Sequence, residues 1–265
     1  MTHEEASNLK PVVVRGRTLN RVGEPLICTS LVGRSKKAID DELASILPKR
    51  PDLLEWRVDF FDRIHEPDQV ESVAVAIRRA AGDLPIIFTR RAVHEGGEAI
   101  GIDEVHVVAL YERLIIAGAI DIIDTELSQP AANRTRLRAS SRAHGVAMIL
   151  SHHNFDDTPT FDAMLEQFLT AEREGADIAK LAVMPRTPSD VLALLEATVA
   201  ASERVSIPLI SISMGGLGAL SRVCGALVGS ALTYAVGESR SAPGQIPIEA
   251  LRAALATLAR ARLGT

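Results

Sequence analysis

Apolar runs typical of buried strands alternate along the chain with segments of helical periodicity. Eight strand-like runs occur, at residues 25–31, 53–61, 85–91, 120–127, 146–155, 178–185, 208–214 and 231–236. Eight helical segments alternate with them, at residues 35–49, 67–82, 102–119, 130–145, 160–175, 187–203, 217–229 and 247–263. This alternation predicts parallel βαβ units, and eight of them in 265 residues match the count and size of a closed (β/α)8 TIM barrel. An open, doubly wound sheet is the alternative fold.

The first 24 residues precede this alternation. Their segment VVVRGRTLNRVGEP is able to form a hairpin across the N-terminal end of a barrel. We therefore predict one (β/α)8 barrel domain over residues 1–265, in which residues 1–24 form an N-terminal extension that closes the bottom of the barrel.

Composition argues against several classes of partner. A formal net charge of −5 and 3% aromatic residues give neither the basic surface nor the stacking platforms that nucleic acid requires. The opening MTHEEASNLK lacks the apolar core of a signal peptide, and no window approaches 18 uninterrupted apolar residues. We expect a cytoplasmic protein with no nucleic-acid or membrane partner. Cys28 and Cys224 have no paired spacing and are expected to be buried free thiols.

Charged residues occupy one face of several predicted strands. In LLEWRVDFF, Glu55, Arg57 and Asp59 alternate with apolar residues that must meet the surrounding helices, so the three charges are predicted to face the barrel interior. The same alternation turns further side chains inward, namely Thr89, Arg91, Asp124, Glu126, Lys180 and Ala182.

Such inward charges need a reason, because a buried ion costs several kcal/mol unless it is paired and hydrogen-bonded. One interpretation is a layer of mutually satisfied ion pairs. The other is an active site, which we favour because the charges gather toward the C-terminal halves of the strands, where barrel active sites lie.

Lys180 interrupts the apolar run GADIAKLAVMP and is the only lysine after Lys49. A lysine that served solubility would have polar neighbours. Beside Arg57 and Arg91 in a partly dry pocket, its amine is expected to lose its proton readily. A neutral amine attacks carbonyl groups, so Lys180 is a candidate for Schiff-base chemistry.

Schiff-base chemistry needs a base, and SHHNFDD places His152 and His153 on the strand before Lys180. Successive strand residues face opposite sides, so only one histidine can face the lysine. The pattern of apolar residues leaves both open. A metal site on HHNFDD is a weaker alternative, because neighbouring histidines of an extended strand cannot easily share one ion, and no second histidine set has ligand spacing.

Seven motifs follow one another between about residues 25 and 250, namely EWRVD, RRAVHEGGE, IDTEL, SHHNF, GADIAKLAVMP, SMGGLGALSR and SAPGQ. In this order they resemble the type I 3-dehydroquinate dehydratases, the Schiff-base dehydratases of the shikimate pathway. The resemblance implies a (β/α)8 barrel and a lyase that dehydrates 3-dehydroquinate to 3-dehydroshikimate by syn elimination, in aromatic amino acid biosynthesis. It also implies a homodimer and no metal, nicotinamide or flavin cofactor.

The resemblance also assigns residues. It implies that Lys180 forms the Schiff base, that His153 is the general acid and base, and that Glu95 positions and tunes His153. At His152, this chain departs from the tyrosine usual in the family. The residues implied to bind substrate are Ser30, Glu55 and Arg57 at the hydroxyls, Arg91, Arg222 at the carboxylate, and Ser241 and Gln245 on a lid.

Two other functions fit parts of this pattern. A class I aldolase acting on another hydroxy-keto acid would use the same lysine chemistry. The set of Arg57, Arg91 and Arg222 with the Ser241 and Gln245 lid instead suits a polyhydroxy carboxylate without phosphate. A non-catalytic barrel that binds a carboxylate would leave Lys180 and its neighbouring histidine unexplained.

Overall fold

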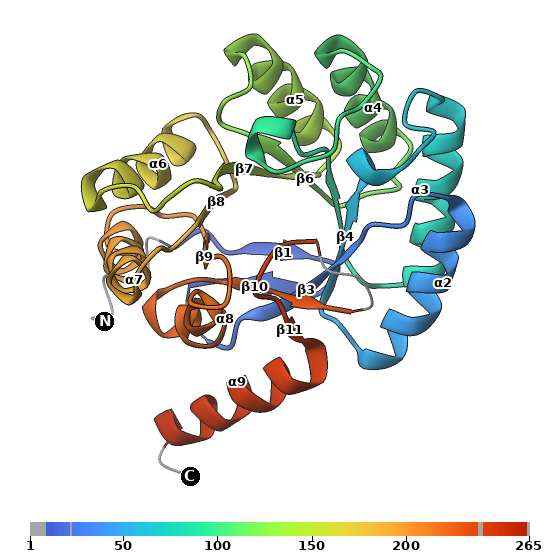
Figure 1. The fold of residues 1–265 in the computed structure, drawn as a ribbon. Helices are drawn as coiled ribbons and strands as arrows, with labels where there is room; N and C mark the ends of the chain where they lie inside the picture. Colours follow the sequence, from blue (N-terminus) through green and yellow to red (C-terminus); the bar gives the residue numbers. More distant parts are fainter. Residues whose placement is uncertain (1–8, 22, 238–240, 264–265) are drawn as a thin grey trace.

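The computed structural model describes residues 9–21, 23–237 and 241–263. Its centre is a ring of eight parallel strands (Figure 1): β3 (Leu26–Leu31), β4 (Leu53–Arg57), β5 (Ile86–Thr89), β6 (Ile122–Glu126), β7 (Ala147–Asn154), β8 (Ile178–Val183), β9 (Leu209–Ser213) and β10 (Leu232–Val236). Consecutive strands pair from β3 to β9, and β10 pairs back with β3. A bridge between Leu209 and Ser230 joins β9 to the start of β10. The predicted (β/α)8 barrel is confirmed.

Helices surround the ring on its outer side (Figure 1). They are α2 (Lys36–Ile46), α3 (Pro67–Ala81), α4 (Glu104–Ile116), α5 (Ala131–Ala143), α6 (Phe161–Arg173), α7 (Pro188–Ser202), α8 (Ala219–Cys224) and α9 (Ile248–Leu263). Trp56, Phe88 and Leu150 point outward from the strands into the core shared with the helices. Their partners along each strand therefore point into the barrel.

A separate apolar cluster fills the lower half of the barrel interior. Each strand contributes one buried residue to this bottom layer: Cys28, Leu53, Ile87, Ile122, Ile149, Ile178, Ile210 and Leu232. Branched aliphatic side chains are the usual filling of a barrel core. The bottom layer is thus a packed floor beneath the charged part of the interior.

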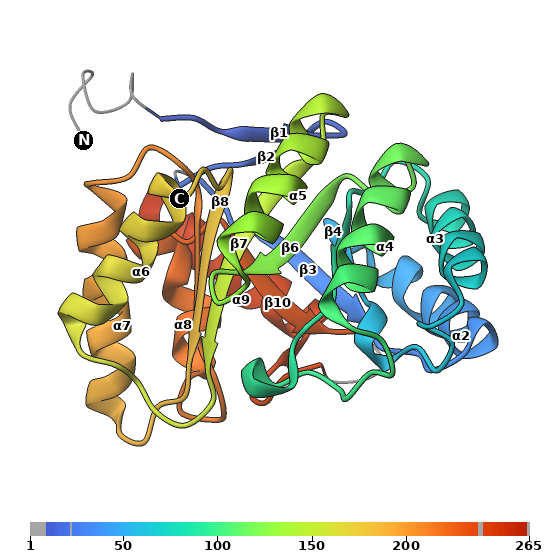
Figure 2. The same ribbon diagram turned by 90° about the horizontal axis from the view of Figure 1, so that it is seen from above.

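The N-terminal extension forms the predicted hairpin. Strands β1 (Val12–Val14) and β2 (Arg17–Leu19) pair antiparallel and lie across one end of the barrel (Figure 2). Leu19 is fully buried within the interior cluster. Arg15 forms an ion pair with Asp121, which directly precedes β6. The hairpin therefore closes the N-terminal end; residues 1–8 and 22 of the extension lie outside the described residues.

The predicted strand 53–61 is wrong in its second half. The strand ends at Arg57, and Val58–Phe60 form a 3₁₀ turn. Asp59 lies inside this turn and accepts hydrogen bonds from the Arg57 side chain and the Arg91 backbone N–H. Phe60 consequently does not join the helix-facing core; its ring lies 5.0 Å from the Arg57 guanidinium carbon.

The predicted helix 217–229 is also too long. Helix α8 ends at Cys224 and continues as a 3₁₀ turn, Gly225–Val228. Gly229 has a φ of +105°, and the N–H of Ser230 donates to the carbonyl of Gly225, so the chain turns back into β10. A short strand not predicted from the sequence, β11 (Ile246–Pro247), pairs with β10.

The two cysteines are free thiols. Cys28 is buried as predicted, whereas Cys224 is only half-buried. Within the described ranges, no helix has the length and apolar character needed to cross a membrane.

Candidate active site

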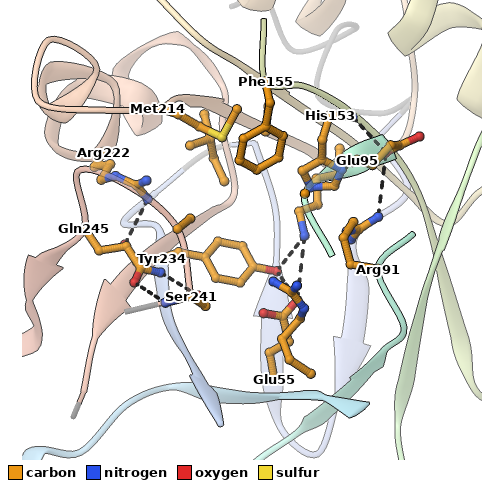
Figure 3. A pocket seen from close by; sticks show the side chains of 16 residues that line it. Glu55, Arg91, Glu95, His153, Phe155, Met214, Arg222, Tyr234, Ser241 and Gln245 are labelled. Carbon is orange, nitrogen blue, oxygen red and sulfur yellow. Dashed lines mark hydrogen bonds and ion pairs between the residues drawn. The ribbon is translucent and has the colours of Figure 1, made fainter. Parts of the chain in front are cut away.

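A cavity opens at the C-terminal ends of the barrel strands, and Figure 3 shows the side chains that line it. The space between its lining atoms, its open mouth included, is about 470 Å³. The predicted site residues in its wall are Glu55, Arg57, Arg91, Glu95, His153, Lys180, Arg222, Ser241 and Gln245. Ser30 lies behind this wall, donating to Glu55 at 2.6 Å and accepting from Ser241 at 2.9 Å. All the predicted site residues thus gather at one place.

Lys180 projects from the middle of β8, and its side chain is 5% exposed. Its Nζ lies 2.7 Å from Asp124 Oδ2, 3.7 Å from Glu55 Oε1 and 3.2 Å from the Tyr234 hydroxyl. We predicted arginines around this amine, and for its nearest contacts that prediction is wrong. Two carboxylates hold the ammonium ion, and an imine formed on the same nitrogen would inherit them as counter-ions.

Arg91 lies in the cavity wall and forms a layer of ion pairs with buried partners. Its guanidinium donates to Asp124 at 2.8 Å, to Ser151 at 2.8 Å and to Glu126 at 3.2 Å. Burial alone would raise the pKa of the Asp124 carboxyl, but the charges of Arg91 and Lys180 hold that pKa well below its usual range. The ion-pair layer considered from the sequence is therefore present, and it coexists with a cavity.

Arg57 and Arg222 differ sharply in their partners. Arg57 makes a two-pronged pair with Asp59, at 2.9 and 2.8 Å. Arg222 is 2% exposed, and among the described residues it donates to the carbonyls of Tyr234 and Pro243, at 3.2 and 3.0 Å. Within the described ranges, its Nε has no partner and no carboxylate pairs with it.

The electrostatics of Arg222 follow from this isolation. Burial lowers the pKa of its guanidinium to about 10. A buried cation without a counter-ion is unfavourable, and a guanidinium fork is suited to bidentate pairing with a carboxylate. Arg222 is therefore prepared to bind an anionic ligand at the cavity.

The strand register decides which histidine enters the cavity. Ser151 pairs with Lys180 and His153 with Ala182, so Ile149, Ser151 and His153 form the inward face of β7. Burial, followed by the charges of Arg91 and Lys180, holds the pKa of His153 well below its usual range. His153 is therefore a neutral imidazole at neutral pH, available as a base.

Glu95 lies directly against His153 (Figure 3). Its Oε2 accepts from the His153 backbone N–H at 2.9 Å and contacts Nδ1 at 3.0 Å. An ionised Glu95 holds the imidazole hydrogen on Nδ1 and leaves Nε2 without one. Burial, with the charge of Glu126 adding to it, raises the pKa of Glu95 to about 7. The charge that orients His153 thus titrates near neutral pH.

The glycines after Glu95 make this contact possible. A Cβ on Gly97 would lie 1.9 Å from the carbonyl oxygen of Arg91, and one on Gly96 would lie 2.3 Å from the Phe155 ring. The chain must pass this close for the 3₁₀ turn Val93–Glu95 to bring its last residue against β7. The EGG motif therefore serves the placement of one carboxylate.

The described part of the loop after β10 covers the side of the cavity near Arg222. Gln245 accepts from the Ser241 N–H at 3.1 Å and donates to the Ser241 hydroxyl at 3.0 Å. Gly244 has a φ of +75°, and a Cβ there would lie 2.0 Å from the Gly215 carbonyl oxygen. The loop thus lies directly against the segment between β9 and α8.

Several residues that line the cavity or contact Lys180 were not among the predicted site residues. Asp124, the closest partner of Lys180, had been assigned an inward direction but no role. Tyr234 lies two residues after Leu232 of the floor and faces inward like it. This spacing was the sequence signal that could have placed Tyr234 in the cavity. The apolar part of the wall also contains Phe155, Ala182, Ile212, Met214 and Ala242.

One group of donor atoms has metal-like spacing. Single ligand atoms of His94, Glu95 and Glu126 lie within 4.8 Å of one another. Glu95 is already engaged by His153, and Glu126 by Arg91 and the backbone N–H of Ala92. We therefore assign Glu95 to the support of His153 and Glu126 to the support of Arg91.

Comparison with known proteins gives a consistent result. The sequence pattern of the family described as type I 3-dehydroquinase matches residues 27–262. A 3-dehydroquinate dehydratase of Albidiferax ferrireducens is 49% identical, with 95% of this chain and 96% of the relative covered. One from Aromatoleum aromaticum is 45% identical over 95% and 96% of the two chains. The crystal structure of the enzyme from Geobacillus kaustophilus is 44% identical and superimposes with a TM-score of 0.92 over 94% of this chain and 96% of that one.

Proposed function

From the premise that this chain belongs to the type I 3-dehydroquinase family, we infer that its cavity dehydrates 3-dehydroquinate to 3-dehydroshikimate through a Schiff base on Lys180. The chain is a 3-dehydroquinate dehydratase of the shikimate pathway, which leads to the aromatic amino acids. The observation that carries the Schiff-base mechanism is the buried amine of Lys180 in the cavity wall, between Asp124 and Glu55.

Substrate binding is assigned to the rim of the cavity. The substrate carboxylate pairs with Arg222, whose guanidinium lacks a carboxylate partner within the described ranges. Glu55, held by Ser30, and Arg57 face the ring hydroxyls together with Ser241 and Gln245 of the lid. Arg91, which also lines the cavity, helps to hold the substrate and is itself positioned by Asp124 and Ser151.

The reaction begins when the neutral imidazole of His153 takes one proton from the Lys180 ammonium, which frees the Nζ lone pair to add to the C3 ketone. His153 moves protons during formation of the carbinolamine and its collapse to the iminium. The nitrogen is cationic before the reaction and cationic again in the iminium. Asp124 and Glu55 therefore stabilise both forms without reorganisation.

The elimination follows from the same two groups. The iminium withdraws electrons and acidifies the C2 protons, and His153 removes one of them to give the enamine. The protonated His153 then returns its proton to the C1 hydroxyl, which leaves as water. One base that serves both transfers requires loss from the same face of the ring. Hydrolysis of the imine releases 3-dehydroshikimate and restores Lys180.

Borohydride trapping tests the covalent step. The protein is incubated with 3-dehydroquinate and sodium borohydride, and intact mass and peptide mapping are recorded. We expect the mass of the reduced substrate adduct on Lys180. An enzyme that turns over substrate, seen as enone absorbance, yet gains no mass would overturn the Schiff base. Binding without enone formation would instead favour the non-catalytic barrel.

Two histidine variants distinguish between the two candidate bases. His153→Ala is expected to accumulate imine, because the protein lacks the base for the next step, and borohydride then traps more adduct than in the wild type. The matched control is His152→Ala, which keeps His153 and is expected to pass through the imine to product. An empty Lys180 in His153→Ala together with stalled imine in His152→Ala would reverse the assignment.

The assembly is proposed to be a homodimer in the cytoplasm. Light scattering on the full chain at micromolar concentration measures the mass in solution. A mass of one chain, 28.4 kDa, would contradict the dimer.

A further inference from the structure

Tyr111 belongs to α4, which covers the outer side of the ring of strands (Figure 1). Its side chain is buried, and its ring packs edge-on against Phe88 of β5, with the ring centroids 4.9 Å apart. Its hydroxyl accepts a hydrogen bond from the Arg90 backbone N–H at 2.8 Å and donates one to the Asp124 backbone carbonyl at 2.7 Å. One phenol oxygen therefore joins the end of β5 to β6.

The Tyr111 hydroxyl stands in place of one backbone hydrogen bond of the sheet. Strands β5 and β6 are paired in parallel up to Thr89 and Asp124. In a parallel ladder, the N–H that follows one member of such a pair can bond to the carbonyl of the other, and here these groups belong to Arg90 and Asp124. Tyr111 takes both bonds instead, so two hydrogen bonds in series span the gap that one would close. The two strands therefore separate at this level, where β5 ends and β6 continues to Glu126.

The backbone groups that Tyr111 holds belong to residues beside the Lys180 nitrogen. Asp124 turns its side chain to the inside of the barrel, where Oδ2 lies 2.7 Å from Lys180 Nζ and Oδ1 accepts from Arg91 at 2.8 Å. Arg91 directly follows Arg90 in the chain. From the outer face of the ring, Tyr111 thus fixes the backbone from which Asp124 and Arg91 project into the site.

We propose that Tyr111 is a positioning residue whose hydroxyl sets the separation of β5 and β6, and thereby holds Asp124 where it directs the Lys180 nitrogen toward the substrate ketone. The hydroxyl acts through Asp124 and Arg91 rather than by contact with the substrate. Such placement matters, because a misplacement of about 1 Å in a reacting group can lower a rate by about 100-fold. The inference rests on the proposed function, in which Lys180 is the nucleophile.

The surroundings of Tyr111 hold its hydroxyl in place. Phe88 packs against the ring, and the backbone of two strands engages the oxygen both as donor and as acceptor. Burial raises the pKa of the Tyr111 hydroxyl, so the group keeps its hydrogen and continues to donate. Helix α4 also holds Arg90 by a second contact, the ion pair between the Arg90 side chain and Glu104. The helix therefore grips the end of β5 at two points.

Steady-state kinetics of Tyr111→Phe test this role. Phenylalanine keeps the ring against Phe88 and removes only the hydroxyl. We expect kcat to fall about tenfold, because the nucleophile is misplaced. KM should stay within about twofold, because Arg222 and Gln245 bind substrate on the side of the cavity away from Arg91 (Figure 3). A kcat within about twofold of the wild type, or a rise in KM alone, would overturn the proposal.

Thr198→Val is the matched control. Thr198 is a fully buried residue of α7, and its hydroxyl donates to the Leu194 carbonyl at 2.7 Å. Valine there also removes one buried hydroxyl hydrogen bond at nearly constant shape, and urea unfolding compares the cost of the two changes to the fold. We expect wild-type kcat and KM in Thr198→Val. A fall in kcat equal to that of Tyr111→Phe would make the effect one of stability and overturn the proposal.

A second measurement does not depend on turnover. Crystal structures of the ligand-free wild type and of Tyr111→Phe compare the positions of the atoms directly. Without the hydroxyl, the Arg90 N–H and the Asp124 carbonyl are expected to close the gap, and the distance from Lys180 Nζ to Asp124 Oδ2 to lengthen beyond about 3.5 Å. An unchanged Lys180–Asp124 distance would show that Tyr111 has no such role. Because no substrate is present, this result stands apart from a failure of the proposed Schiff base.

Discussion

The barrel interior has a lower and an upper half, whose inward-facing residues are two positions apart along each strand. In the lower half, each strand contributes an apolar side chain, such as Ile178 of β8, and the hairpin residue Leu19 closes the floor. One inward position higher, β8 presents Lys180, β6 presents Asp124 and β4 presents Glu55. The same strands and the same alternation thus build a packed floor and a charged cavity.

The two halves are stabilised in different ways. Full burial of an aliphatic side chain contributes about 1.5–3 kcal/mol, and the floor collects that gain from every strand. The upper half contains buried ions, whose desolvation is offset only by pairing, as between Arg91 and Asp124. Arg222 has no such offset within the described ranges. Of the two halves of the interior, the floor therefore contributes stability and the upper half chemical reactivity.

The largest effect is expected from Lys180→Ala, because it removes the proposed nucleophile. We expect kcat/KM to fall by at least about 10⁴-fold, as for other covalent catalysts that lose their nucleophile. Enone absorbance measures the rate, and circular dichroism checks that the barrel is intact. A folded variant with a near-normal rate would contradict covalent catalysis.

Ile178→Ala tests the floor on the same strand, one inward position below the lysine. Truncating a fully buried isoleucine is expected to lower the free energy of unfolding by about 2–4 kcal/mol. The rate per folded molecule should stay within about twofold of the wild type, since the side chain belongs to the floor. Urea unfolding and steady-state kinetics measure the two quantities. A variant that keeps its stability but loses activity would show that the floor also contributes to catalysis.

Arg222→Leu sharpens the comparison within the upper half. Loss of the carboxylate partner is expected to raise KM by about 100-fold, or roughly 2.7 kcal/mol. Its free energy of unfolding should be unchanged or higher, because no carboxylate within the described ranges loses a partner. Arg57→Leu is the matched control: it leaves buried Asp59 unpaired and should cost about 3 kcal/mol of stability. Equal destabilisation by the two changes would contradict this view of Arg222.

The smallest effect is expected from Glu95→Gln. The pKa of Glu95 is raised to about 7, so its charge is present above that pH and is lost as the pH falls through it. Wild-type activity should therefore fall on the acidic side of neutrality. Glutamine does not titrate, so the variant should lack this limb, with a plateau about tenfold lower, a smaller loss than removal of the base itself. A limb that persists unchanged would assign it to another group.

Much of this division could be predicted from the sequence, because both halves follow the two-residue period of a strand. Glu55 and Arg57 share the inward face of β4, as predicted from the apolar residues between them. The period fails where the strand ends. Asp59 leaves it because its carboxylate bonds to the Arg57 side chain and to the Arg91 backbone, a contact from another strand.

The choice between the two histidines shows a different limit. On β7, apolar residues occupy both faces, with Met148 and Leu150 toward the helices and Ile149 toward the interior. Hydrophobicity therefore cannot orient this strand. The informative residue is Ser151, whose small polar side chain shares the inward face with His153 and binds Arg91. Its importance depends on a partner two strands away, which local periodicity does not reveal.

Among the described residues, the hairpin and the floor close the N-terminal end of the barrel, and the active-site cavity opens at the other end. Leu19 blocks the far end, so the substrate and its dehydrated product must pass through the same mouth. The cavity consequently holds one ligand at a time, and the product must dissociate before the next substrate molecule can bind. Accumulated product should therefore inhibit the enzyme competitively. Its rate then depends on how fast the next enzyme consumes the product.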